Sequence, residues 1–323
     1  MKDQTNYLRK LIIPVVAFIA VFAFDWKYMG SEDFSAVLVW WLALLILGMV
    51  FQPVCVILFN RFHDNGWMFS KTIGLAFSAW LLWYFSSLKV LKFTRFNCIA
   101  IISVCFILNL LVYKLYTKNA ERAIKIREVY SSKKLVSMLN AEIMFFVAFA
   151  IWCYLKGYNP SAYGTEKFMD YGFITAILKS DYMPAHDLWL SGEGINYYYV
   201  GQYISAFFIR VTGVGAGYGY NLMMMTLAAF GFSLPYSIAY NLMLRLRITM
   251  SKQHGYKLTE EQKGSITEEQ KRELEALKAE QRSQDIEYDG LVRESAGLST
   301  RAKAMATGKE LEQIREREDL GKQ

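Results

Sequence analysis

The sequence predicts an all-α fold: a polytopic bundle of about seven transmembrane helices with an external amphipathic loop and a soluble helical C-terminal tail. Hydrophobic residues make up 54% of the 323 residues, which is more than an ordinary soluble domain contains. The excess lies before residue 250, in runs close to the roughly 20 residues that cross a bilayer. Residues 251–323 are almost entirely polar. The chain therefore combines a large membrane part with a soluble part.

Seven apolar runs approach the spanning length. They are Leu11–Phe24, Phe34–Phe59, Trp67–Leu88, Asn97–Tyr116, Leu135–Leu155, Tyr197–Val214 and Tyr218–Leu244. The first run needs its flanks in order to cross, and no signal-peptide cleavage site follows it. The last contains Pro235, which removes a backbone hydrogen bond and can kink or break the helix. These runs divide the chain into membrane regions at 1–134 and 135–250 and a tail at 251–323.

Basic residues set the predicted orientation, because cytoplasmic loops of membrane proteins are enriched in lysine and arginine. Basic residues precede the first run, and the largest cluster lies between the fourth and fifth runs: Lys114, Lys118, Arg122, Lys125, Arg127, Lys133 and Lys134. A smaller group disagrees, because Lys89, Lys92 and Arg95 would lie outside. The larger cluster outweighs it and predicts a cytoplasmic N-terminus, with loop 157–195 on the outer face of the cell (plasma) membrane.

The side of the tail stays open. An odd number of crossings would place it outside, whereas Arg245 and Arg247 favour the cytoplasm. Within it, the capping-box pattern at 267–270 predicts a helix, solvated or bound to a partner. The net charge of the chain is +7, and the basic excess lies entirely in the membrane part, since residues 251–323 are slightly acidic. The excess therefore indicates cytoplasmic loop ends, and no motif predicts binding to nucleic acid. The four cysteines lie in or beside apolar runs without metal-site spacing.

The external loop holds the candidates for chemistry. Glu166 and Asp170 are four residues apart, so they share a face if the segment is helical. The apolar period that begins at Phe168 predicts an amphipathic helix on the membrane surface. Either carboxylate is a candidate general base for an acceptor hydroxyl. The alternative is a solvated loop whose acidic residues serve only to keep it hydrated.

Further along the loop, Asp181 and Asp187 are candidate ligands for a divalent metal, Mg²⁺ or Mn²⁺, although a single nearby histidine, His186, is a weak signal. Trp189 is either an interfacial anchor or a surface that stacks on a sugar. Because Tyr197, Tyr198 and Tyr199 are consecutive, they cover most of a helix circumference, and at least one must face the protein. Arg210, in the apolar run that follows, either reaches the cytoplasmic interface or is functional.

Several motifs carry a family resemblance. They are TEKFMD at Thr165–Asp170, Pro184 with Asp187-Leu188-Trp189, Gly192, INYYYVGQ at Ile195–Gln202, Tyr220-Asn221-Leu222, and DNGWMFSKTIGL at Asp64–Leu75. Together they make the chain resemble the Chlor_Arch_YYY family of large polytopic membrane proteins, which is named for its triple tyrosine. The likeness covers roughly residues 35–245.

That family in turn looks similar to the GT-C superfamily of membrane glycosyltransferases, by analogy of fold. The resemblance implies a polyprenyl-phosphate sugar donor and an external carboxylate base, Glu166 or Asp170. It places Lys167 at the donor phosphate, and Asp187 with Tyr197–Tyr199 around the donor. Members of the family continue with further spans, so we expect a truncated product, an inactive remnant, or a subunit whose membrane partner supplies those spans.

Two other functions compete with a transferase. A non-catalytic membrane scaffold or lipid-binding subunit would have no donor pocket and would tolerate changes in Tyr197–Tyr199. A transporter would need ionisable residues within its spans, and Glu142 is the clearest of the few. Membrane lipid is a partner under every hypothesis.

Overall fold

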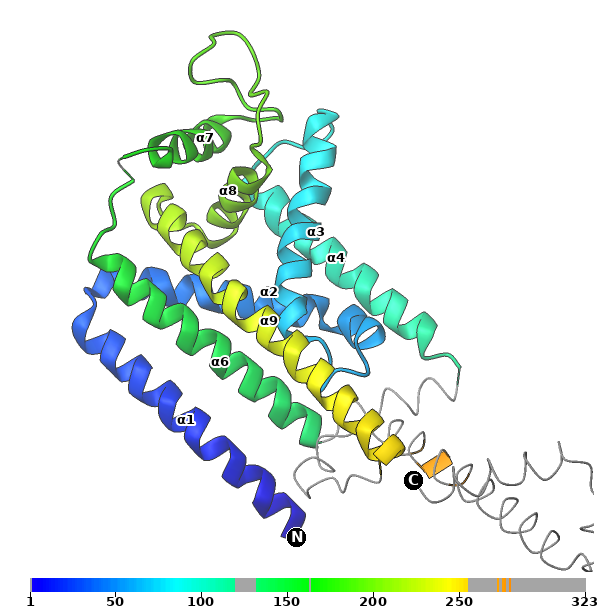
Figure 1. Ribbon diagram of the computed structural model, residues 1–323. Coiled ribbons are helices and arrows are strands. Elements are labelled where there is room, and N and C mark those ends of the chain that lie inside the picture. The colour runs from blue at the N-terminus through cyan, green and yellow to red at the C-terminus, as the bar shows by residue number, and fades with distance from the viewer. Residues whose placement is uncertain are drawn as a thin grey trace, which may run out of the picture. The chain divides into compact units, whose positions relative to one another are not determined.

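The computed structural model describes residues 2–119, 132–162 and 164–254, together with isolated positions between 272 and 279. As predicted, the fold of these residues is all-helical, and residues Met1–Arg245 form one compact unit (Figure 1). The helices are α1 (Lys2–Tyr28), α2 (Ser31–Leu58), α3 (Trp67–Ser87), α4 (Arg95–Tyr116), α6 (Ser132–Gly157), α7 (Lys167–Lys179), α8 (Val200–Thr212) and α9 (Ala216–His254). Almost all of the predicted helical tail lies outside the described residues.

Among the described residues, five helices are long and apolar enough to cross a membrane, compared with about seven predicted runs. The spans are Leu11–Tyr28, Ser31–Leu58, Arg95–Tyr116, Lys134–Gly157 and Ala216–Arg247. The predicted run Tyr197–Val214 yields only the 13 residues of α8, about 20 Å of helix, which is too short to cross. It is short because the helix begins only after the tyrosines and ends at Gly213, whose left-handed backbone closes it.

Helix α3 is absent from those five, although it traverses the bundle. Its 21 residues measure about 31 Å, but polar residues such as Lys71 lower its hydropathy. Helix α2 ends at the turn Phe59–Gly66, whereas α4 begins at the opposite end of the bundle, beside the loop that contains α7 (Figure 1). Helix α3 makes the return between them. We call these two ends the turn end and the loop end.

Helix α9 bears on the disagreement, in the sequence, between the number of crossings and the position of Arg245. It begins at the loop end, runs unbroken through Pro235 and reaches the turn end by Arg245 (Figure 1). Near that end, Asn241 accepts a hydrogen bond from the backbone of His63 at 3.0 Å. Because α8 does not cross, Arg245 lies at the same end as the basic termini of α4 and α6. The position of Arg245 therefore agrees with the basic-residue pattern.

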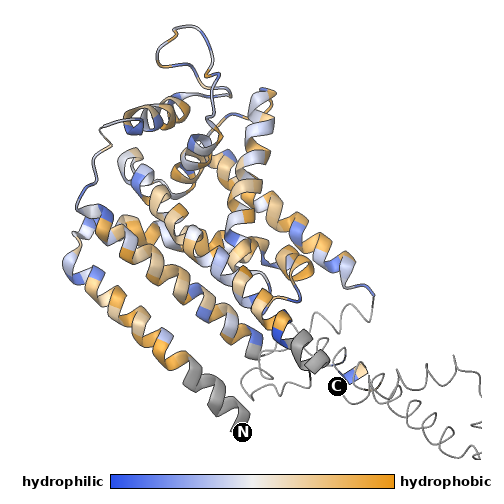
Figure 2. Ribbon diagram, viewed as in Figure 1, coloured by the Kyte–Doolittle hydropathy of each residue, from blue (hydrophilic) through white to orange (hydrophobic). Residues whose placement is uncertain are grey.

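Aromatic packing forms the core of the bundle. Trp40 of α2 is fully buried, meets Phe208 of α8 edge-on at 4.6 Å and donates its indole N–H to Thr226 of α9 at 2.9 Å. Phe145 of α6 contacts Phe230 of α9. Many apolar residues of α1 and α4 are exposed, and the ribbons of both helices are largely hydrophobic in Figure 2, as expected for helices that face lipid.

The turn end is fixed by backbone capping. Asp64 is fully buried, and its carboxylate accepts from the backbone N–H groups of Gly66 and Met68 at 3.2 and 3.3 Å. Gly66 has a φ of 72°, and a side chain there would collide with the ring of Phe59. A carboxylate at a helix N-terminus also opposes the positive end of the helix dipole. This turn directs α3 back through the bundle.

Candidate functional site

The predicted catalytic carboxylates lie at the loop end. Asp170 sits in the first turn of α7, is half-buried, and accepts a hydrogen bond from the side-chain amide of Gln202 at 2.8 Å. Glu166 lies one turn earlier, is exposed, and makes no capping hydrogen bond with its side chain. The backbone N–H of Asp170 donates to the carbonyl of Glu166, so the two acids stand on successive turns, as the spacing predicts. Lys167 begins α7 and is half-buried.

Helices α7 and α8 pack side by side and parallel. Asp170 meets Gln202 near their starts, and the carbonyl of Leu178 accepts from the guanidinium of Arg210 near their ends. The apolar face of α7 buries Phe173, Ile174, Ala176 and Ile177. The predicted amphipathic helix therefore exists, but its apolar face packs largely on protein, and Phe168 remains 57% exposed.

The three tyrosines separate into two environments. Tyr199 is buried, and its hydroxyl accepts from the indole N–H of Trp83 at 2.9 Å. Tyr197 and Tyr198 are exposed and lie against each other, with ring centroids 4.5 Å apart. The prediction that at least one tyrosine faces the protein is confirmed. The other two present aromatic faces to the outside.

Between α7 and α8 the chain forms a small hairpin. The backbones of His186 and Gly194 pair as an antiparallel bridge. Asp187 accepts from the backbone N–H groups of Trp189 and Leu190 at 2.8 and 2.9 Å, and these bonds lower the pKa of its carboxyl. Trp189 is 60% exposed at the tip and meets the ring of Phe173 edge-on. The carboxylate of Asp187 thus orders the hairpin tip.

The two predicted metal ligands have separate partners. Asp181 pairs with Lys92 at 2.9 Å, and this contact raises the pKa of Lys92. Asp187 is engaged in the hairpin. Within the part of the chain that the structure describes, no three His, Cys, Asp or Glu side chains gather in a way that could hold a metal ion.

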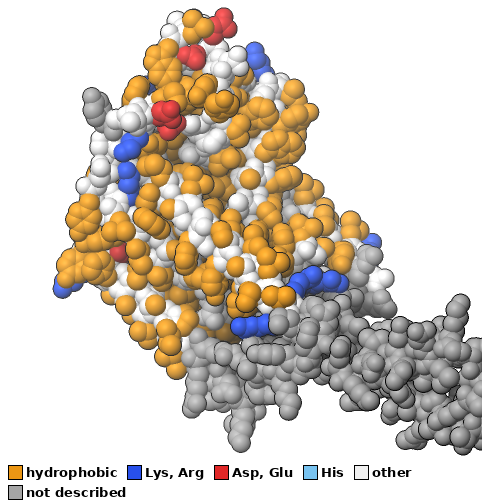
Figure 3. Space-filling view, in the orientation of Figure 1, with side chains coloured by type: hydrophobic (Ala, Val, Ile, Leu, Met, Phe, Trp, Pro, Cys, Tyr) orange, Lys and Arg blue, Asp and Glu red, His pale blue; other side chains and the backbone are white. Residues whose placement is uncertain are grey.

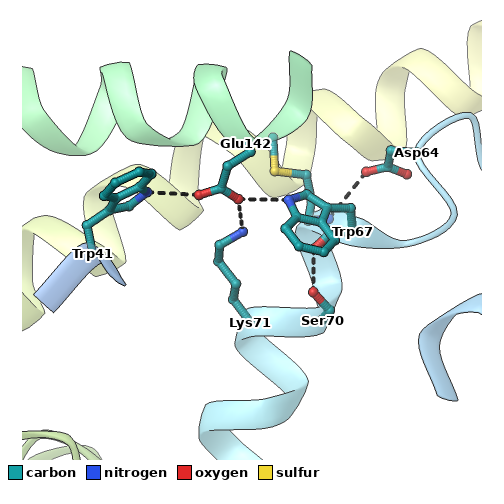
Figure 4. Close-up of polar contacts among 7 residues, drawn as sticks. Trp41, Asp64, Trp67, Ser70, Lys71 and Glu142 are labelled. Atoms are coloured by element: carbon teal, nitrogen blue, oxygen red, sulfur yellow. Dashed lines mark hydrogen bonds and ion pairs between the residues drawn. The ribbon is translucent and has the colours of Figure 1, made fainter. Parts of the chain in front are cut away.

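A second group of ionisable side chains lies inside the bundle, and we call Trp41, Trp67, Lys71 and Glu142 the Glu142 cluster (Figure 4). Glu142 of α6 forms an ion pair with Lys71 of α3, which is fully buried. The indoles of Trp41 and Trp67 donate to its two oxygens at 2.8 and 2.7 Å. The ammonium of Lys71 also lies 4.6 Å from the Trp67 ring, an attractive cation–π arrangement.

Sequence reasoning singled out Glu142 but not its partners, and it identified Asp170 without Gln202. The family-like stretches contain both missed residues, Lys71 within DNGWMFSKTIGL and Gln202 at the end of INYYYVGQ. A lysine within a spanning segment predicts a carboxylate partner, because an unpaired charge inside the membrane is costly. Arg210 donates to the carbonyl of Leu178 at the end of α7, so it lies at the loop end of the bundle.

The charge distribution differs between the two ends. In Figure 3 most visible acidic side chains lie over α7 and the hairpin, whereas basic side chains occur at both ends. Apolar side chains fill the surface between. A helical bundle with an apolar girdle, polar ends and a satisfied ion pair inside defines an integral polytopic membrane protein.

The chain belongs to the family described as "Uncharacterized membrane protein (DUF2298)", whose model matches residues 77–267. The matched region contains α7, the hairpin, the three tyrosines and Gln202, whereas the Asp64–Leu75 stretch precedes it. No curated protein and no solved structure matches the chain.

Proposed function

We propose that the loop end transfers a sugar from a polyprenyl-phosphate donor to a hydroxyl acceptor at the outer face of the membrane, in the manner of a GT-C glycosyltransferase. The hydrogen bond between Gln202 and Asp170 carries the proposal. It joins the TEKFMD and INYYYVGQ motifs and holds one carboxylate oxygen in place. A carboxylate oriented by a second side chain is the arrangement expected of a general base.

In the proposed step, the acceptor oxygen bonds to the anomeric carbon of the sugar while the bond from that carbon to the phosphate oxygen breaks. Asp170 takes the proton of the acceptor, and the polyprenyl phosphate leaves with the bonding electrons. Glu166, one turn away and exposed, is the alternative base. Lys167, beside it, would meet the donor phosphate.

The exposed aromatic side chains support recognition of a sugar. Tyr197, Tyr198 and Trp189 present ring faces at the loop end, and Tyr197 and Trp189 both contact Phe173 of α7. Aromatic rings of this kind combine an apolar face with a polar edge. The basic-residue pattern supports an outer location for this end, where a lipid-linked donor supplies the energy of transfer.

The test is transfer from radiolabelled polyprenyl-phosphate sugars by the purified protein in nanodiscs. Asp170→Asn keeps an oxygen for Gln202 but loses basicity, so we expect transfer to fall about 100-fold or more. Asp181→Asn is the matched control, because Asp181 pairs with Lys92, and it should retain the wild-type rate.

Wild-type transfer rates in both Asp170→Asn and Glu166→Gln would remove the catalytic role of these acids. Absence of transfer by the wild-type protein with every donor would instead favour the scaffold or lipid-binding alternative.

A further inference from the structure

Several basic residues lie at the loop end, where the orientation rule does not expect them, and Lys89, Lys92 and Arg95 lie around the start of α4. Lys92 is matched by Asp181. Arg95 is exposed and has no hydrogen bond or ion pair among the described residues. Positive charge therefore exceeds negative charge around Arg95. A guanidinium without an acidic partner in such a place indicates a site for an anion.

The backbone of α8 shapes the surroundings of Arg95. Three atoms of its guanidinium lie 3.1 Å from the position that a Cβ would occupy at Gly213, so the group lies flat against that glycine. Gly213 has a φ of 78° and closes α8 through a hydrogen bond from its N–H to the carbonyl of Ile209 at 2.8 Å. Only a glycine at position 213 leaves this space for the guanidinium of Arg95.

A second arginine faces the same corner. Arg210, in the last turn of α8, donates one N–H to the carbonyl of Leu178, while its Nε is buried without a hydrogen-bond partner. Its guanidinium lies 5.7 Å from the ring of Phe93. No carboxylate forms an ion pair with Arg95 or Arg210 among the described residues. Arg95 lies against Gly213 and Arg210 lies near Phe93, and we call these four residues the arginine corner.

The position of the arginine corner favours a membrane lipid as the source of the anion. Arg95 is the first residue of the α4 span, and the neighbouring Phe96 and Ile99 are 78% and 46% exposed. Val90, in the turn that precedes α4, is 63% exposed. Exposed apolar side chains beside an interfacial arginine match a lipid, with acyl chains along α4 and the headgroup at the guanidinium.

We propose that the arginine corner binds the phosphate group of a bilayer phospholipid. Guanidinium groups bind phosphate oxygens in bidentate geometry, and a phosphodiester supplies the negative charge that the corner lacks. Gln202 and Arg210 are eight residues apart on α8, which is about 12 Å along the helix. The corner is therefore separate from Asp170, and the proposal does not depend on sugar transfer.

The experiment measures lipid binding by native mass spectrometry of the purified protein in detergent. The probes are phosphatidylglycerol, the matched diacylglycerol without phosphate, a polyprenyl phosphate and inorganic phosphate. We expect phosphatidylglycerol to bind and diacylglycerol not to bind. Arg95→Gln should weaken phosphatidylglycerol binding at least about tenfold, the loss of one charge-assisted contact, and Arg95→Lys should weaken it less.

Lys114→Gln is the matched control, because it removes the same charge from an exposed position at the other end of α4. It should bind phosphatidylglycerol as the wild type does. Equal losses in Arg95→Gln and Lys114→Gln, or none in either, would overturn the site. Binding of polyprenyl phosphate or inorganic phosphate without phosphatidylglycerol would overturn the assignment to a bilayer lipid.

Discussion

Carboxylates occupy contrasting environments at the centre and at the loop end of this bundle. Glu142 is buried, its two oxygens accept from two indoles, and a fully buried lysine neutralises it. Asp170 is half-buried and accepts a hydrogen bond from the side-chain amide of Gln202, whereas Glu166 is exposed. Both oxygens of Glu142 thus already have partners from the protein itself. The loop-end acids retain oxygens that a substrate can use.

This contrast bears on the transport hypothesis. A carboxylate that carries an ion must exchange partners with water or with that ion, whereas each oxygen of Glu142 is bound by a donor from a neighbouring helix (Figure 4). The geometry favours a structural role, in which Glu142 joins α6 to α2 and α3. The loop end, where carboxylate oxygens lack hydrogen-bond partners among the described residues, is the better candidate for the functional site.

The largest expected effect comes from breaking the central ion pair. Glu142→Gln or Lys71→Met leaves one buried charge without its partner, and we expect a loss of about 3–5 kcal/mol in the free energy of unfolding. The double variant Lys71→Met with Glu142→Leu removes both charges and should recover most of that loss. Thermal unfolding in detergent measures all three. Single variants as stable as the wild type would contradict a structural role.

A smaller effect is expected from crowding the lysine. A Cβ at Gly48 of α2 would lie 3.0 Å from Cγ of Lys71 and 3.1 Å from the hydroxyl of Ser70. Because both ends of the Lys71 side chain are fixed, Gly48→Ala should cost about 1–2 kcal/mol of unfolding free energy, after the gain in helix propensity is subtracted.

Gly231→Ala is the control for this crowding, since nothing lies within 4 Å of a Cβ there. It should leave the melting temperature unchanged or raise it. If Gly48→Ala melts no lower than Gly231→Ala, the packing around Lys71 is looser than described.

The smallest effect concerns the hairpin. The backbone donors of Trp189 and Leu190 lower the pKa of Asp187, so the ionised carboxylate stabilises the tip above the ordinary pKa of an aspartate. That stabilisation is lost as the pH falls through the lowered pKa. Hydrogen exchange of residues 185–195 should therefore be slower in the wild type than in Asp187→Ala near neutral pH.

On acidification below about pH 4, the ordinary range of an aspartate, this difference in exchange should shrink. A difference that stays constant down to pH 2 would show that the carboxylate does not hold the tip.

Much of the architecture could be predicted from local pattern. The all-helical class, a helix that includes Asp170, and a buried member of the tyrosine triplet are all present in the structure. The prediction failed for α8, because an apolar run was counted by length although a non-helical tyrosine segment and a left-handed glycine shorten the helix. The run Trp67–Leu88 was predicted to cross, and α3 traverses the bundle over that stretch even though Lys71 lowers its hydropathy. The buried charge of Lys71 is neutralised by Glu142, 71 positions away.

By itself, the sequence determined that this protein lies in a membrane and that its acidic and aromatic residues gather in one loop, because hydropathy and charge are properties of the local chain. Only the tertiary structure decided that Lys71 neutralises Glu142, that Gln202 positions Asp170, and that Arg95 remains unpaired beside Gly213. The physical reason is that the cost of a buried or interfacial charge depends on its partners, and those partners come from distant segments. Periodicity along the chain does not record such pairings.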